Sequence, residues 1–334
     1  MNKNVKAAIR FIIFFGLGIF LIWLSVKNLT QKDIDEIKTS LNRANYIWLF
    51  VAVIVGAISN VSRAMRWKQL LQPLNQNPKL SNTFFAVMVG YFANYAVPRL
   101  GEVTRCGILA RYDKVPFAES LGTVIVERII DVICFLLFVA IVFLIQFETI
   151  WGYLKENFLP GMSGKQDGSG LLVFVLIAVV ATGVLVFVFR KKILSLFGDK
   201  VKKMITGFAD GIKAIAKVKS PALFIAHSVF IWLCYYVMLH VTFWSITETS
   251  SLGVDAVATA FILGTVMIMV TPGGIGAYPI AIQGVLTMYA VNTNVGYAVG
   301  WLAWLCQFVS NVFFGALSLI LLPLLNKENN AAAK

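Results

Sequence analysis

Charged and amide side chains recur inside the apolar stretches of this chain, in three separate groups. A charged side chain at membrane depth costs about 2.5–3.5 kcal/mol to insert, so such residues tend to be paired and functional. The first group repeats every three residues, which places its members on one face of a helix. The second surrounds a Pro-Arg dipeptide, and the third spans one helical turn. In chain order the groups are Asn60, Arg63 and Arg66; Asn94, Arg99, Glu102 and Arg105; and Glu127, Arg128 and Asp131.

All of these residues except Asn60 are candidates for substrate binding, because together they favour an anion. Their five arginines exceed their three carboxylates by two positive charges, and a planar guanidinium matches the oxygens of a phosphate. Two interpretations without a ligand are also open. Arg63 and Arg66 could extend to the cytoplasmic headgroups. Residues 127–131 could form a purely internal ion network.

The sequence contains no pattern that is typical of nucleotide, metal or nucleophile chemistry. The glycine-rich stretch Pro272–Gly276 lacks the Gly-Lys-Ser/Thr ending of a phosphate-binding loop. The four cysteines lie far apart in apolar surroundings, without the spacing of a metal or redox site. We therefore expect no catalytic residue, no metal or other cofactor, and no nucleic-acid partner.

Apolar runs of membrane-spanning length recur from one end of the chain to the other. Of the 334 residues, 59% are hydrophobic and 13% are charged, and about 20 apolar residues suffice to cross a bilayer as a helix. The sequence therefore predicts an all-α polytopic membrane protein with one membrane-embedded domain, residues 1–334. Six full transmembrane helices are expected at residues 7–26, 46–71, 116–146, 171–190, 221–246 and 296–323.

Two further apolar segments are interrupted by proline and glycine, so eight hydrophobic units are expected in all. The first interrupted pair joins residues 81–97 to a short arm that ends at Arg111, and the second joins residues 253–270 to 277–291. Proline and glycine break helices, and a break survives in a membrane only where protein or water satisfies its backbone. The expected hinge positions are Pro98, Gly101, Pro272, Gly273, Gly274 and Gly276.

The distribution of Lys and Arg predicts the orientation of the chain. Most of the 29 Lys and Arg residues fall on the cytoplasmic side if both termini are cytoplasmic, as positive residues prefer. To keep the cluster at residues 190–192 on that side, the first broken pair must enter and leave the membrane from the cytoplasm, as a re-entrant hairpin. Charge does not distinguish a hairpin from two full spans at residues 253–291. The membrane expected is the bacterial cytoplasmic (inner) membrane.

Residues 1–146 and 171–323 share one order of units, namely span, span, broken pair and span. Three crossings in each half would invert the second half relative to the first, an arrangement typical of transporters. An inverted repeat is therefore our hypothesis. Residues 198–220 mix lysines with apolar residues at helical spacing, so they form either a basic amphipathic helix on an anionic leaflet or a plain connector.

Three ordered motifs together resemble a known family. They are Asn94-x3-Pro98-Arg99-x-Gly101-Glu102-x2-Arg105, Glu127-Arg128-x2-Asp131 and Pro272-Gly273-Gly274-x-Gly276. Over nearly the whole chain this pattern is similar to the lysylphosphatidylglycerol synthase transmembrane-region family. In its best-known members, the multiple peptide resistance factors, the membrane part flips aminoacylated phosphatidylglycerol and a soluble aminoacyl-transferase domain follows. The resemblance implies a flippase-like membrane part. Because no such transferase domain follows here, lysyl transfer is not expected.

The expected function is flippase-like translocation of an anionic lipid, aminoacylated or linked through polyprenyl phosphate, across the inner membrane. The expected partners are the membrane lipid substrate, a separate lipid-modifying enzyme and a second copy in a homodimer. Two other functions are open. One is a membrane-embedded enzyme acting on polyprenyl phosphates, with Glu127 or Asp131 as base or metal ligand. The other is an ion-coupled transporter of a small organic anion, with Glu102 or Asp131 carrying the proton.

Overall fold

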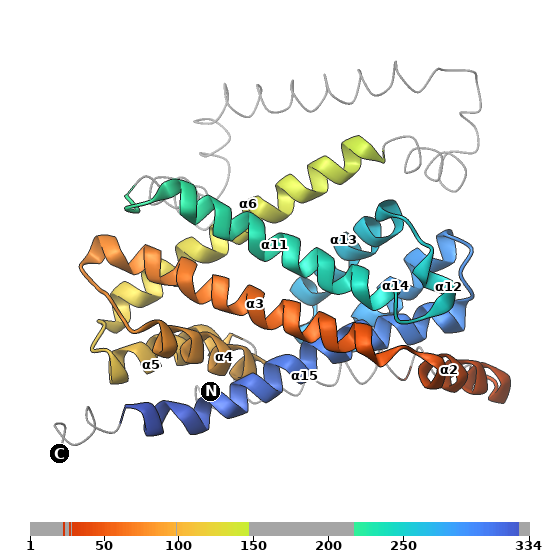
Figure 1. The fold of residues 1–334 in the computed structure, drawn as a ribbon, viewed down its shortest axis with the longest axis horizontal. Coiled ribbons are helices and arrows are strands. Elements are labelled where there is room, and N and C mark those ends of the chain that lie inside the picture. The colour runs from red at the N-terminus through yellow and green to blue at the C-terminus, as the bar shows by residue number, and fades with distance from the viewer. Residues whose placement is uncertain (1–22, 24–26, 28, 98, 147–216, 327–334) are drawn as a thin grey trace, which may run out of the picture. The chain divides into compact units, whose positions relative to one another are not determined.

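The computed structural model describes helices and no strand within residues 23, 27, 29–97, 99–146 and 217–326 (Figure 1). The span expected at residues 171–190, the span expected at 7–26 apart from Trp23, and most of segment 198–220 lie outside the described residues. The chain divides into two compact units, the first of residues 1–127 and 215–334 and the second of residues 128–214. The described part of the second unit is the continuation of helix α6 (Phe117–Ile145) from Arg128, followed by Gln146.

Four helices in the described part are long and apolar enough to cross a membrane, namely α3 (Tyr46–Leu71), α6, α11 (Pro221–Phe243) and α15 (Thr293–Leu325). Their bounds lie close to those expected, so the all-α membrane fold is confirmed. The ends follow from local chemistry. Asn45 caps α3 by accepting from the backbone N–H of Ile47 at 3.1 Å. Helix α11 begins at Pro221, and proline suits this position because a backbone N–H in the first turn has no acceptor within the helix.

Both expected breaks are present in the chain. The first separates α4 (Leu80–Ala96) from α5 (Leu100–Tyr112), and the second separates α13 (Val254–Val270) from α14 (Ala277–Met288) by the short 3-10 helix η2 (Pro272–Gly274). Gly273, Gly274 and Gly276 have φ of 62°, 73° and 73°, a left-handed region that glycine enters without cost. Arg99 adopts φ of 67° despite its side chain, which marks the point where the chain turns into α5. Re-entry from the cytoplasm stays a prediction.

The α4–α5 hairpin is held together by direct backbone contact. The Gly101 backbone N–H donates to Asn94 Oδ1 at 2.7 Å, so the end of α4 satisfies a donor in the first turn of α5. A Cβ atom at Gly101 would collide with the carbonyl oxygen of Gly90, and one at Gly90 would lie 3.0 Å from the carbonyl oxygen of Gly101. Asn94 therefore has a structural role at this break.

We expect Gly101→Ala to destabilise the protein by about 1–3 kcal/mol, because a methyl group has no space between the two backbones. Gly107→Ala is the matched control on the same helix, since a Cβ there meets nothing within 4 Å. Alanine should even favour the helix at that site by up to about 1 kcal/mol. The measurement is thermal unfolding of the purified variants in detergent. Equal melting temperatures for the two variants would contradict the close approach.

Helix α3 lies between α4 and α11 in the first unit, and Figure 1 shows α3 (orange) and α11 (green) side by side. A buried apolar cluster joins α3, α4 and α5 to the start of α6 through Trp67, Met88, Cys106 and Val124. On the other side, α15 contacts α3, α4 and α14. The short helix α2 (Gln31–Arg43) docks on α15, where Asn294 Nδ2 donates to Asp33 and Glu36 at 2.9 and 2.8 Å. This packing fixes the helices that carry the candidate site.

Candidate functional site

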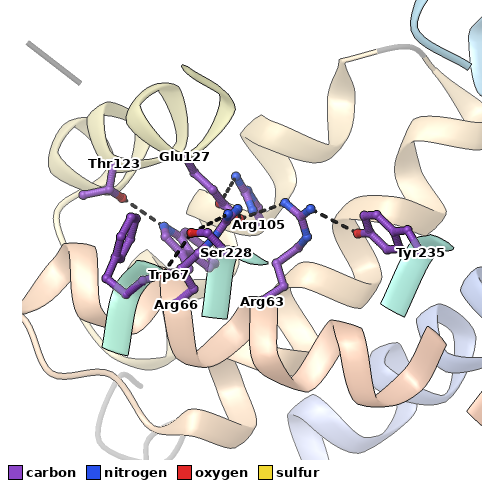
Figure 2. A network of polar contacts seen from close by, with 9 residues as sticks. Arg63, Arg66, Trp67, Arg105, Thr123, Glu127, Ser228 and Tyr235 are labelled. Carbon is purple, nitrogen blue, oxygen red and sulfur yellow. Dashed lines mark hydrogen bonds and ion pairs between the residues drawn. The ribbon is translucent and has the colours of Figure 1, made fainter. Parts of the chain in front are cut away.

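Three buried guanidinium groups converge on the carboxylate of Glu127 in the first unit (Figure 2). Arg63 Nη1 and Arg66 Nη2 donate to Oε1 at 3.0 and 3.1 Å. Arg105 Nη2 lies 2.8 Å from Oε2, in an ion pair that is not aligned as a hydrogen bond. The four side chains are at most 6% exposed. We call these four residues the arginine–glutamate cluster.

The cluster joins helices that are distant in the sequence. Arg63 and Arg66 share a face of α3, Arg105 lies in the second turn of α5, and Glu127 lies in the third turn of α6. Neither α3 arginine extends to the headgroups, because their side chains are 4% and 0% exposed. The interpretation of these two residues as snorkelling side chains is therefore wrong.

Aromatic rings face each guanidinium of the cluster. The Arg105 guanidinium carbon lies 4.6 Å from the centre of the Trp67 ring, and Trp67 Nε1 donates to Thr123 Oγ1 at 2.9 Å. The Arg63 guanidinium lies 6.0 Å from the Tyr91 ring and 5.9 Å from the Tyr235 ring. Because an aromatic face attracts a cation, these rings stabilise the charges and restrict their movement.

Helix α11 supplies two hydroxyl groups to the α3 arginines. Arg63 Nη2 donates to the Tyr235 hydroxyl at 3.0 Å, and Arg66 Nη1 donates to Ser228 Oγ at 3.3 Å. Each α3 guanidinium therefore donates from one terminal nitrogen to Glu127 and from the other to a hydroxyl group on α11, as the dashed lines of Figure 2 show. Sequence reasoning missed these hydroxyls. The available signal was their spacing of seven residues, two helical turns, within an otherwise apolar span.

The donor chemistry of the cluster suits an anion with several oxygens. A guanidinium carries five N–H donors in a fixed fork, whereas a carboxylate offers about four acceptor sites. Among the described residues, Arg105 Nε is buried and has no hydrogen-bond acceptor. Arg105 can therefore serve a further acceptor oxygen beside the carboxylate, and oxygens of this kind are what a phosphate presents.

The sequence profile of the family described as "Lysylphosphatidylglycerol synthase TM region" matches residues 8–324. The chain belongs to this family. Membership confirms the resemblance drawn from the three motifs, and it indicates an integral membrane protein with a function related to membrane lipids.

Three curated proteins that are similar to this chain carry the name UPF0104 membrane protein. One from Methanothermobacter thermautotrophicus is 23% identical over 290 residues, which cover 79% of this chain and 81% of the relative. MJ1078 from Methanocaldococcus jannaschii is 23% identical over 68% of this chain and 92% of its own length. MJ1595 from the same organism is 28% identical over 129 residues, 38% of each chain. No solved structure is detectably similar to the chain.

The structure brings together four of the nine candidate substrate-binding residues of this family member, namely Arg63, Arg66, Arg105 and Glu127. Asn94 instead accepts from the backbone N–H of Gly101 in the first turn of α5, and Glu102 is half-buried one turn before Arg105. The Arg99 side chain is exposed and makes no hydrogen bond or ion pair within the described part of the chain. Arg128 and Asp131 belong to the second unit, and the cluster is described for the first unit alone.

Of the hinge residues, Gly273 in the second break lies beside the end of α4, just before the first break. Trp304 Nε1 on α15 donates to the carbonyl oxygen of Gly273 at 2.7 Å, so a carbonyl exposed by the break has a partner. A Cβ at Gly273 would lie 3.1 Å from the ring of Tyr95, which precedes the first break. Pro98 lies outside the described residues. Among the residues that are described, no three His, Cys, Asp or Glu side chains form a metal-binding group, and the expectation of no cofactor stays a prediction.

Proposed function

We propose that this family member translocates an anionic lipid in a flippase-like manner, and that Arg63, Arg66 and Arg105 bind the headgroup phosphate. The observation that supports this proposal is the convergence of three buried guanidiniums on one carboxylate. A buried ion pair is weak evidence of stabilisation, because desolvation offsets most of its attraction. Three arginines around Glu127 therefore favour a binding role over a purely structural one.

Glu127 would hold the empty site in shape. It orients the three guanidiniums while no headgroup is bound, since each of them contacts one of its oxygens. An arriving phosphate takes over part of these contacts, because guanidinium forks bind phosphate and carboxylate oxygens in the same way. The exchange substitutes phosphate oxygens for carboxylate oxygens at some of the guanidiniums, so each guanidinium keeps an anionic partner while the headgroup passes.

The two breaks would supply the movement that exposes the site to one leaflet and then the other. Transporters commonly place discontinuous helices beside their substrate site. Here α5, which carries Arg105, begins directly after the first break. The second break adjoins the first through Tyr95 and Gly273, and the left-handed glycines of the second break permit a change of backbone angle that other residues resist.

We also propose the cellular setting. The protein would lie in a cytoplasmic membrane with both termini cytoplasmic, since the charge bias of its loops favours that side. The lipid would be made by a separate enzyme, and a homodimer is the expected assembly.

The test is translocation by the full-length protein in phosphatidylcholine vesicles that contain traces of fluorescent phosphatidylglycerol. Dithionite, which quenches only the outer leaflet, should bleach the inner-leaflet probe faster in vesicles with protein than in protein-free vesicles. Labelled phosphatidylcholine should move more slowly. Equal rates with and without protein would contradict the flippase function. Metal-dependent chemical change of the lipid would indicate the enzyme instead, and gradient-driven uptake of a soluble anion that ignores lipid composition would indicate the transporter.

A further inference from the structure

The Tyr235 hydroxyl uses only half of its hydrogen-bonding capacity. It accepts from Arg63 Nη2 at 3.0 Å, and within the described residues it makes no other hydrogen bond. A phenol both accepts and donates, so its own proton is available beside the Arg63 guanidinium. The Tyr235 side chain is half-buried, whereas the guanidinium that it contacts is nearly inaccessible. The hydroxyl therefore offers a second kind of donor at the cluster.

Ser228 provides the contrast on the same helix. Its hydroxyl accepts from Arg66 Nη1 at 3.3 Å and donates to the carbonyl oxygen of Phe224 at 2.9 Å. Both of its roles are thus occupied by protein groups. Ser228 can orient Arg66, but it has no proton left for a ligand.

The Tyr235 ring is placed so that the hydroxyl stays with the guanidinium. Arg63 lies 5.9 Å from the centre of the ring and 6.0 Å from that of Tyr91, and Trp232 packs edge-on at 6.2 Å. A ligand oxygen bound by Arg63 on the side of α11 would therefore lie within reach of the phenol. A donor that is positioned in advance costs little to order when the ligand binds.

We propose that Tyr235 is a further headgroup-binding residue, whose O–H donates to a phosphate oxygen held by Arg63. The inference rests on the proposed function, since it assigns a residue to the same site. It also predicts a division of labour along α11, in which Tyr235 contacts the ligand and Ser228 positions an arginine.

The experiment measures equilibrium binding of fluorescent phosphatidylglycerol to the full-length protein in detergent, by energy transfer from its tryptophans. Tyr235→Phe keeps the ring and removes the hydroxyl. We expect it to weaken binding about tenfold, as for a lost hydrogen bond to a charged group, with an unchanged melting temperature. Tyr236→Phe is the matched control, because its hydroxyl points to the carbonyl oxygen of Val254 at 3.4 Å, and it should bind as wild type.

The outcomes separate this inference from the flippase function. The role of Tyr235 would be overturned if Tyr235→Phe binds the lipid with the affinity of the wild type. It would also be overturned if the affinity falls together with a lower melting temperature that Tyr236→Phe does not share. Weaker binding by Tyr235→Phe with an unchanged melting temperature supports the role of Tyr235. This holds even if the wild type binds the lipid without translocating it, which would overturn the flippase function alone. Unlabelled phosphatidylglycerol should displace the probe. Displacement by inorganic phosphate in similar excess would show that the site takes free phosphate and not a lipid headgroup, which would overturn the assignment.

Discussion

Glu127→Gln is expected to lower the free energy of unfolding by about 3–5 kcal/mol, because it removes the charge that three buried guanidiniums share. Anionic lipid should then restore much of the lost stability, since a headgroup phosphate can take the place of the missing carboxylate. The measurement is the melting temperature in mixed micelles of detergent with phosphatidylglycerol or with phosphatidylcholine. The rise caused by phosphatidylglycerol should be larger for the variant than for the wild type.

The same variant should translocate slowly. Without the Glu127 carboxylate, nothing in the cluster competes with the phosphate for the guanidiniums, so the phosphate is retained. We therefore expect the variant to bind the lipid more tightly and to translocate it at a lower rate. Glu119→Gln is the matched control on α6, because Glu119 is exposed and accepts a hydrogen bond from Gln76 at 3.2 Å. A Glu127→Gln protein that melts like the Glu119→Gln control, or gains no more from phosphatidylglycerol than from phosphatidylcholine, would contradict the exchange of carboxylate for phosphate.

Arg105→Ala is expected to reduce translocation about hundredfold or more, whereas Arg99→Ala should stay within a few-fold of wild type. Arg105 is buried, contacts Glu127 and lies over the Trp67 ring, so its loss removes both a ligand for phosphate and a buried partner worth about 3–5 kcal/mol. Arg99 is exposed at the start of the same helix. The two variants are compared in the vesicle assay at equal amounts of reconstituted protein.

Arg105→Lys refines this comparison. Lysine keeps the charge but loses the planar fork that contacts two oxygens, so we expect an intermediate rate. If Arg105→Lys matches the wild type, charge alone is needed and the phosphate fork is not supported. A large loss in Arg99→Ala with full activity in Arg105→Ala would place the site at the break and not at the cluster.

The spans and breaks could be predicted because their signals are local. About 20 apolar residues predict a membrane-spanning helix, and a proline or a run of glycines predicts a break, whatever the rest of the chain does. The bounds of α3 agree with the predicted 46–71. The difference between Arg99 and Arg105 could not be predicted. Both belong to one motif, and their environments depend on the left-handed turn at Arg99 and on the packing of α5 against α4.

The cluster itself depends on tertiary packing. The spacing of Arg63 and Arg66 predicts that they share a helix face, but not that this face meets Glu127, which lies about 60 residues further along the chain. Tyr235 and Ser228 carry no charge and sit in an apolar span, so hydropathy does not distinguish them from packing residues. Asn94 shows the opposite case, since a polar residue beside charged ones proved to satisfy a backbone donor.

The central claim is that the arginines gathered by Glu127 bind the phosphate of a membrane lipid. The most direct measurement is a structure of the full-length protein in nanodiscs rich in phosphatidylglycerol, with an Arg105→Ala protein prepared in parallel. We predict a headgroup phosphate within hydrogen-bonding distance of the cluster guanidiniums, with Glu127 withdrawn from at least one of them, and no such density in the variant. An unchanged cluster in a protein that translocates the lipid, with headgroup density only elsewhere, would contradict the claim.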